Sequence, residues 1–189
     1  MRDAKVWLLG AIDGAMLLGL YAITFWLPTM IRNTGVADPF HVGLLTAIPH
    51  VAAAVAMIAI GWRSDRLRER RWHSAVPMFV GAAALALSAT ATQNLTATVA
   101  LLAIANAGIL GALAPFWSIP GNFLRGAGAA AGMALVASIA NLAGFFSTYL
   151  VGWLMDLTHS AAGALVVFAL CLALGGLAVL RLPSKLVDC

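Results

Sequence analysis

Six long apolar runs constrain this chain more than any other feature of its sequence. Each run holds roughly the 20 residues that an α-helix needs to cross a hydrocarbon core of about 30 Å. Charged residues make up only 10% of the 189 residues, too few to cover the surface of a soluble domain. The runs lie at 6–31, 42–62, 74–92, 96–117, 128–154 and 161–180. The sequence therefore predicts an all-α membrane protein, with six transmembrane helices in one domain over residues 1–189. The first run exceeds the roughly 7 to 15 apolar residues of a secretory signal, so it is expected to be a spanning helix.

The basic residues are distributed unevenly, and their distribution predicts the orientation. Residues 61–73, GWRSDRLRERRWH, hold five of the eleven basic residues. If the N-terminus is inside, only Arg32 falls in an outer loop. The basic residues of the inner segments are then Arg2, Lys5, Arg63, Arg66, Arg68, Arg70, Arg71, Arg125, Arg181 and Lys185. Because Lys and Arg in short loops stay on the cytoplasmic side, both termini and residues 61–73 are expected to face the cytoplasm from the inner membrane.

The same features exclude several classes of function. The net charge of +4 is explained by topology and by anionic lipid head groups, so nucleic acid is not an expected partner. Cys171 and Cys189 suggest neither a disulfide framework nor a metal site. The chain has no H-E-x-x-H, G-x-S-x-G or phosphate-binding glycine loop, so neither an enzyme nor a cofactor is expected.

The basic segment at 61–73 has two interpretations. It could serve orientation alone. It could also be a latch between two helices, because Gly61 would allow a close approach and Asp65 could accept hydrogen bonds from a helix N-terminus or an arginine.

Polar residues inside the predicted spans are the candidates for a substrate path, because they usually face a bundle interior. At helical spacing Asp13, Leu17, Tyr21, Thr24 and Pro28 share one face, which we expect to point at a central cavity. Burial would favour the neutral form of Asp13 and make it a candidate proton carrier; the alternative is that Asp13 reaches water at the inner surface.

His50 is a second ionisable residue within a predicted span. Counting about 1.5 Å per residue, it lies roughly 8 Å from Asp13 in depth, so a direct pair is not expected. A structural His50, hydrogen-bonded within the bundle, is the favoured interpretation.

Two further faces carry amide groups. One face, in the fifth run, consists of Ser138, Asn141, Phe145 and Thr148. The other, in the fourth run, consists of Asn106, Leu110, Leu113 and Trp117. Asn141 could contact substrate or form an interhelical hydrogen bond. Trp26 and Trp117 could equally be interfacial aromatics. The spacings Gly10-x-x-x-Gly14 and Gly128-x-x-x-Gly132 are expected to let helices pack closely.

The segment GWRSDRLRERR resembles the loop signature Gly-x-x-x-Asp-Arg-x-Gly-x-Arg-Arg of the major facilitator superfamily, matched here by Gly61, Asp65, Arg66, Arg70 and Arg71. Arg68 departs from it, standing where the signature has glycine. The stretches LYAITFWLPTMI, VGLLTAIPHVAAAVAMIAIG, PFWSIPGNFLRGAGAAAGMALV and YLVGWLMDLT are more specifically similar to the second half of the anion:cation symporter family, which includes tartrate-type and phthalate-type permeases.

This resemblance implies half of a twelve-helix bundle, built as two three-helix inverted repeats. It implies secondary transport of a small organic anion, coupled to a cation or a proton. It also places Tyr21, Trp117 and Asn141 on helices around the cavity. The substrate-cavity candidates are therefore Asp13, Tyr21, Thr24, Trp117, Ser138 and Asn141.

The resemblance also predicts what is missing. The chain would supply only spans seven to twelve, as the product of a truncated gene, a sequence with a miscalled start, or one part of a split transporter. Its expected partners are membrane lipid, a small organic anion, and either an N-terminal six-helix half or a second copy in a homodimer. The alternative is a membrane helix bundle that does not transport, either an inert remnant or an interaction subunit.

Overall fold

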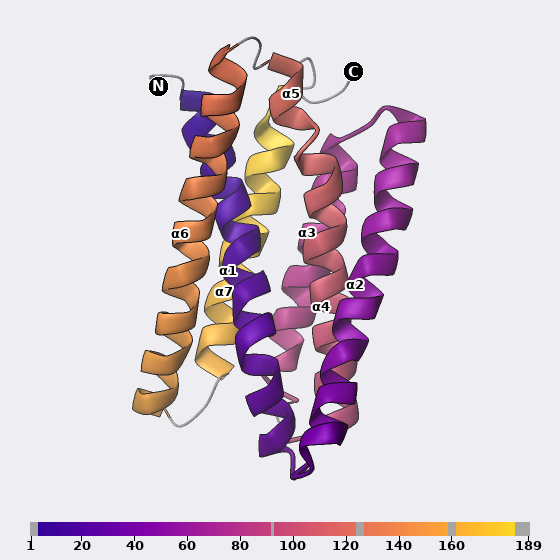
Figure 1. Cartoon of the computed structure of the whole chain (residues 1–189), viewed down its shortest axis with the longest axis vertical. Coiled ribbons are helices and arrows are strands. Elements are labelled where there is room, and N and C mark those ends of the chain that lie inside the picture. Colours follow the sequence, from indigo (N-terminus) through magenta and orange to yellow (C-terminus); the bar gives the residue numbers. More distant parts are fainter. Residues whose placement is uncertain (1–3, 92, 124–126, 159–161, 184–189) are drawn as a thin grey trace.

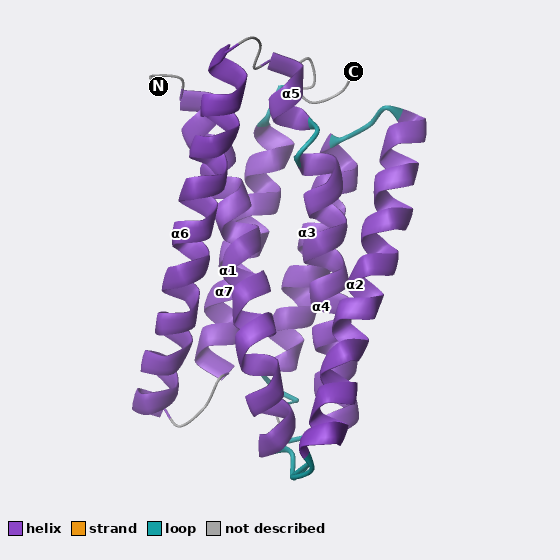
Figure 2. Ribbon diagram, in the orientation of Figure 1, coloured by secondary structure: helices purple, strands orange, loops and turns teal. Residues whose placement is uncertain are grey.

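The computed structural model describes residues 4–91, 93–123, 127–158 and 162–183. All regular structure within these ranges is helical (Figure 2). The helices are α1 (Ala4–Asn33), α2 (Pro39–Leu67), α3 (Arg71–Ser88), α4 (Leu95–Phe116), the short α5 (Ile119–Phe123), α6 (Ala127–Thr158) and α7 (Ala162–Arg181). Five of them, α1, α2, α4, α6 and α7, are long and apolar enough to cross a membrane.

The third predicted span differs from the other five. Helix α3 has 18 residues and is not among the candidate spans, because it begins with the polar residues Arg71 and His73. It ends at Ser88 rather than at the predicted residue 92, which lies outside the described residues. Helix α3 nevertheless packs along α4 and α7 (Figure 1). The described residues thus hold five candidate spans with a shorter sixth helix alongside them.

The predicted spans 42–62 and 74–92 leave residues 63–73 as a loop, and this part of the prediction was wrong. Helix α2 continues past the predicted end at residue 62 to Leu67, so Arg63 and Arg66 are helical. Helix α3 already begins at Arg71, which leaves only residues 68–70 as a turn. Leu and Arg are good helix formers, and the helix stops only where Arg68 adopts the left-handed conformation.

Four helices form the centre of the bundle. In this central group α1 packs on α4, α4 on α3, α3 on α7, and α7 on α1. Helix α2 lies outside the group against α4, and α6 lies outside it against α1, so these two helices form opposite edges of the molecule in Figure 1. The largest fully buried side chains include those of Leu9, Met16, Leu85, Leu102, Ile109 and Phe168.

Glycines permit the closest contacts. The α1 glycines Gly10 and Gly14 lie against Ile139 and Ala143 of α6, as the first glycine spacing predicted. The second spacing was wrong for Gly128, whose position for a Cβ has nothing within 4 Å among the described residues. This residue stands in the first turn of α6.

The helices alternate in direction, so the start of α1, the 68–70 turn, α5 and the end of α7 lie at one end of the bundle (Figure 1). Lys5 and Arg181 are therefore at the same end as the arginines of 61–73, and Arg32 is at the opposite end. Arg2, Arg125 and Lys185 lie outside the described residues.

Helix α2 starts at the end that holds Arg32. The carboxylate of Asp38 caps it by accepting hydrogen bonds from the N–H groups of Phe40 and His41, at 3.4 and 3.3 Å. The hydrogen bond with the His41 ring holds the pKa of the Asp38 carboxyl below its usual value.

Candidate functional site

A hydrogen-bonded pair joins the middle of α1 to the middle of α6. The hydroxyl of Tyr21 donates to Asn141 Oδ1 at 2.7 Å, and Asn141 Nδ2 donates to the carbonyl of Ala137 at 2.8 Å. The Tyr21 ring lies directly over Gly144, where an added Cβ would be 2.7 Å from Tyr21 Cδ2. Glycine at this position therefore lets the tyrosine ring lie against the α6 backbone and reach Asn141.

A cleft of about 420 Å³ lies beside this pair. It is lined by Tyr21, Phe25, Trp26, Thr29, Phe145 and Thr148. The rings of Tyr21 and Phe25 meet edge to face with their centroids 5.9 Å apart. The volume and the mostly aromatic walls are those of a small-molecule pocket, and the Tyr21 hydroxyl is a polar group at its edge.

Asp13 and Leu17 do not share the surroundings of Tyr21, so the predicted continuous polar face was wrong. Both are buried in the bundle, Asp13 with 1% of its surface exposed, whereas Thr24 is exposed. Helix α6 contacts α1 at this level through Gly10 and Gly14. Among the described residues, Asp13 Oδ1 has no hydrogen-bond partner.

Three other candidates also lie outside the cleft. Thr24 is exposed on α1 but does not line it. Ser138 is exposed on α6, and its hydroxyl donates to the carbonyl of Ala134 at 2.8 Å. Trp117, just after α4, is half-buried and meets Phe116 edge to face. The structure thus brings together Tyr21 and Asn141 and leaves the other candidates apart.

Two polar groups of the spans serve the bundle itself. His50 Nδ1 lies 3.0 Å from the carbonyl of Thr46 in its own helix, a contact of the structural kind favoured from the sequence. Asn106 is fully buried, and its Nδ2 donates to the carbonyl of Pro49 at 3.2 Å, which links α4 to α2. Asn106 therefore takes part in the contact between these two helices.

Sequence reasoning missed Phe25 and Thr29 as cleft residues. The signal was present, because Tyr21, Phe25 and Thr29 are spaced four residues apart and share one face of a helix. The predicted face instead included Thr24, three residues after Tyr21, and left out Phe25. Residues three and four positions after Tyr21 lie on different sides of its helical face. Which of these two sides lines the cleft depends on where α6 packs against α1.

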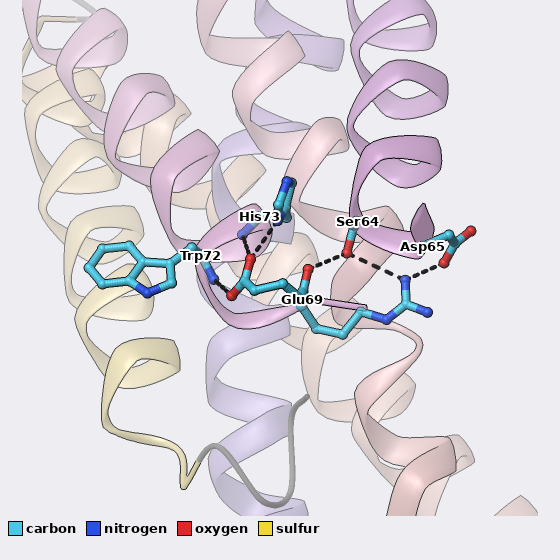
Figure 3. A network of polar contacts seen from close by, with 6 residues as sticks. Ser64, Asp65, Glu69, Trp72 and His73 are labelled. Atoms are coloured by element: carbon cyan, nitrogen blue, oxygen red, sulfur yellow. Dashed lines mark hydrogen bonds and ion pairs between the residues drawn. The ribbon is translucent and has the colours of Figure 1, made fainter. Parts of the chain in front are cut away.

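A second polar cluster joins α2 to α3 at the basic end (Figure 3). Asp65 forms an ion pair with Arg70 across the turn, and Arg70 Nη1 lies 3.4 Å from Ser64 Oγ. The buried Ser64 hydroxyl donates to the carbonyl of Glu69 at 2.6 Å. These contacts tie the end of α2 to the turn that follows it.

The carboxylate of Glu69 caps helix α3. It accepts hydrogen bonds from the N–H of Trp72 at 2.5 Å and of His73 at 3.3 Å, and its Oε2 lies 2.5 Å from His73 Nδ1 (Figure 3). Of the two partners predicted for Asp65, the structure shows the arginine. The helix N-terminus is hydrogen-bonded by Glu69 instead.

The remaining residues of the signature have different surroundings. Gly61 faces Ala114 of α4, at 3.5 Å from the position of an added Cβ, and Arg66 stacks over the Trp62 ring at 5.4 Å. Arg71 is the half-buried first residue of α3.

We expect Arg68→Gly to stabilise the protein. Arg68 has φ 52° and ψ 32°, a left-handed conformation that costs an L-residue about 1–2 kcal/mol. Glycine adopts it without strain but makes the unfolded chain more flexible, so the net gain should be about 0.5–1 kcal/mol. Thermal unfolding in detergent measures the gain. Arg68→Ala is the matched control, because it removes the charge and keeps the Cβ; equal stability of the Ala and Gly variants would contradict the strain.

Comparisons with known proteins find relatives of this chain among transporters. The chain is 54% identical over 186 residues to NicT of Pseudomonas putida, provisionally named a metabolite transport protein; the match covers 98% of this chain and 43% of NicT. It is 38% identical over 165 residues to a provisionally named tartrate transporter of Agrobacterium vitis, covering 87% of this chain and 36% of that protein. The chain is related to transporters of the major facilitator superfamily. No family model matches it.

A third relative is the quinolone resistance transporter of Acinetobacter baumannii, 31% identical over 175 residues, which cover 93% of this chain and 40% of that protein. The chain therefore spans less than half the length of these relatives, as a C-terminal half would. The relatives named here are transporters and not enzymes, and together with the apolar helices they identify the chain as a multi-pass membrane protein.

Proposed function

We propose that the chain is the C-terminal six-helix half of a secondary transporter for a small organic anion. In this proposal it crosses the cytoplasmic membrane with both termini and the 68–70 turn inside, and a second six-helix half completes the site. The two sets of three long helices, α1 to α3 and then α4, α6 and α7, are the inverted repeats of such a half. The gathering of basic residues at the end that holds the 68–70 turn supports the orientation.

The exposed pair of Tyr21 and Asn141 is the observation that carries the proposal. Both residues lie near the middle of long apolar helices, where a polar group facing lipid is costly. Asn141 is nevertheless exposed, with an aromatic cleft of about 420 Å³ beside it. A face of this kind is stable where it looks onto a water-filled cavity, as the face of a substrate path does.

Helices α2 and α6 support the need for a second half. Only 11% of the most apolar stretch of α2 and 17% of that of α6 is buried within the chain, against 67% for α1. A second bundle packed beside these two edge helices would cover them and close the cavity between the halves.

The cleft favours an anion with a hydroxyl or carboxylate group next to an apolar or planar part. The Asn141 amide has a second Nδ2 hydrogen besides the one that it donates to Ala137, and the Tyr21 hydroxyl oxygen can accept a hydrogen bond while it donates to Asn141. The rings of Phe25 and Phe145 supply apolar contact. The predicted spans hold no arginine to bind the carboxylate, so we assign that charge contact to the other half. The name of the Agrobacterium relative makes tartrate the first candidate.

Asp13 is the group that we propose for proton coupling. A buried carboxylate without a hydrogen-bond partner for Oδ1 is much costlier as an anion than as a neutral acid. It would therefore carry its proton until a change between inward and outward states opened a path to water. An imposed proton gradient should then drive uptake; uptake indifferent to that gradient would leave Asp13 a structural residue.

The proposal predicts uptake only when both halves are present. The experiment measures entry of labelled tartrate and other small organic anions into proteoliposomes that hold the chain alone or with the N-terminal half of NicT. Tyr21→Phe should lower the rate about tenfold, because the hydroxyl next to the cleft is lost. Tyr149→Phe is the matched control, since Tyr149 is exposed on α6 and does not line the cleft.

Three outcomes would contradict the proposal or the site assigned in it. Uptake by the purified chain at monomeric stoichiometry would show that no second half is needed. No uptake by both halves together, across the tested anions, would favour the alternative of a non-transporting bundle whose open α2 and α6 faces bind other helices. Equal uptake rates for Tyr21→Phe and Tyr149→Phe would show that the cleft is not part of the substrate path.

A further inference from the structure

A groove separates α2 from α3. Both helices pack along α4 but contact each other little, and α4 forms the floor between them with the small residues Ala107 and Gly108. The groove has a volume of about 500 Å³. Its walls carry Ile60 of α2, Val76 and Val80 of α3, and Ile104 of α4. It lies apart from the cleft between α1 and α6, and none of its lining residues lines that cleft.

One end of the groove differs from the rest. Arg63, Trp72 and His73 line it at the end next to the 68–70 turn, and the other lining residues are apolar. The groove thus has an aliphatic length and a polar mouth at the end of the bundle. This division matches a membrane lipid, with acyl chains in the hydrocarbon and a head group at the interface.

The polar mouth of the groove carries a net positive charge, and its arginine is accessible. Residues 61–73 hold five arginines and two acids, a net charge of +3 (5 − 2). Both acids are engaged elsewhere: Asp65 pairs with Arg70, and Glu69 binds the start of α3 and the His73 ring (Figure 3). Arg63 is exposed and has no ion pair with any described residue. An anion is therefore the complementary partner for it.

We propose that this groove binds one anionic phospholipid of the leaflet next to the 68–70 turn. An acyl chain lies between Ile60, Val76, Val80 and Ile104, and the head-group phosphate accepts hydrogen bonds from the Arg63 guanidinium, whose planar fork fits a phosphate. The Trp72 indole lies at the interfacial level, where tryptophan is enriched. The inference rests on the membrane location of the chain and does not depend on transport.

The test is native mass spectrometry of the purified full chain in detergent, titrated with phosphatidylglycerol. Arg63→Gln should weaken binding about fivefold, the effect of one arginine near an anionic lipid surface. Arg66→Gln is the matched control, because this substitution removes the same charge about one turn further along α2. The Arg66 side chain stacks on Trp62 and does not line the groove. Val76→Trp should fill the groove and weaken binding as well, without any change of charge.

The remaining arms separate a lipid from a free anion. Phosphatidylcholine should bind more weakly than phosphatidylglycerol, and glycerol 1-phosphate should not compete, because it has no acyl chain. Equal losses for Arg63→Gln and Arg66→Gln would overturn the site in favour of general attraction by the basic end. Full competition by glycerol 1-phosphate, or unchanged binding in Val76→Trp, would show that the apolar groove takes no part.

Discussion

Replacing Gly108 with alanine is expected to destabilise the protein by about 3 kcal/mol, the upper part of the range for overpacked cores. A Cβ at this position would lie 2.5 Å from the carbonyl oxygen of Pro77 and 2.8 Å from the nitrogen of Gly81. Both atoms belong to the backbone of α3, so no side chain can turn away to make room. The two helices would have to separate along their whole contact. Unfolding by heat or by sodium dodecyl sulfate in mixed micelles measures the loss.

The control for this variant is Gly43→Ala. Gly43 is inside α2, and the position of its Cβ has nothing within 4 Å. Alanine should change the stability there by at most about 1 kcal/mol, in the stabilising direction expected from helix propensity. If both alanine variants behaved alike, the close approach of α3 to α4 would not be present in the folded protein.

Glu69→Ala is the second variant with a large expected effect, a loss of about 2 kcal/mol. The carboxylate accepts hydrogen bonds from two N–H groups in the first turn of α3 and meets the His73 ring. Alanine would leave those donors without an acceptor and remove a negative charge from a helix N-terminus. Thermal unfolding measures the loss, and faster hydrogen exchange at Trp72 and His73 would locate it.

Asp65→Ala provides the comparison, although Asp65 is the acid that matches the superfamily signature. Its side chain is 67% exposed and pairs with Arg70 in contact with solvent. Such pairs contribute at most about 1 kcal/mol, so this variant should be the milder one. A larger loss for Asp65→Ala than for Glu69→Ala would reverse the assignment of the cap.

Much of the fold followed from hydrophobicity, because a helix in lipid must satisfy its own backbone. The ranges 6–31 and 96–117 differ from α1 and α4 by two residues or fewer at each end. The end of α2 was missed for a different reason. Arg63 and Arg66 are polar and also good helix formers, so the apolar run ends before the helix does. Helix α2 ends because the backbone of Arg68 adopts the left-handed conformation. The hydrophobicity of the sequence contains no information about this change of backbone conformation.

The candidate site was predictable only in part. Tyr21 and Asn141 were identified separately, as polar residues in apolar helices, and the structure joins them. Their pairing depends on which faces of α1 and α6 meet, and this is set by Gly144 beneath the tyrosine ring. Asp13 shows the opposite case. Its spacing from Tyr21 suggested a shared face, but Asp13 is buried inside the bundle, whereas Asn141 is exposed.

The short connection between α2 and α3 limits how these helices can move. Residues 68–70 bridge Leu67 and Arg71, and four steps of the chain reach at most about 14 Å even when fully extended. Helix α2 can thus tilt about this end, pivoting on the turn, but it cannot slide far along α3. Any large displacement of α2 would consequently be greatest at its distant end, near Pro39, while the mouth between Arg63 and Trp72 kept a bounded width.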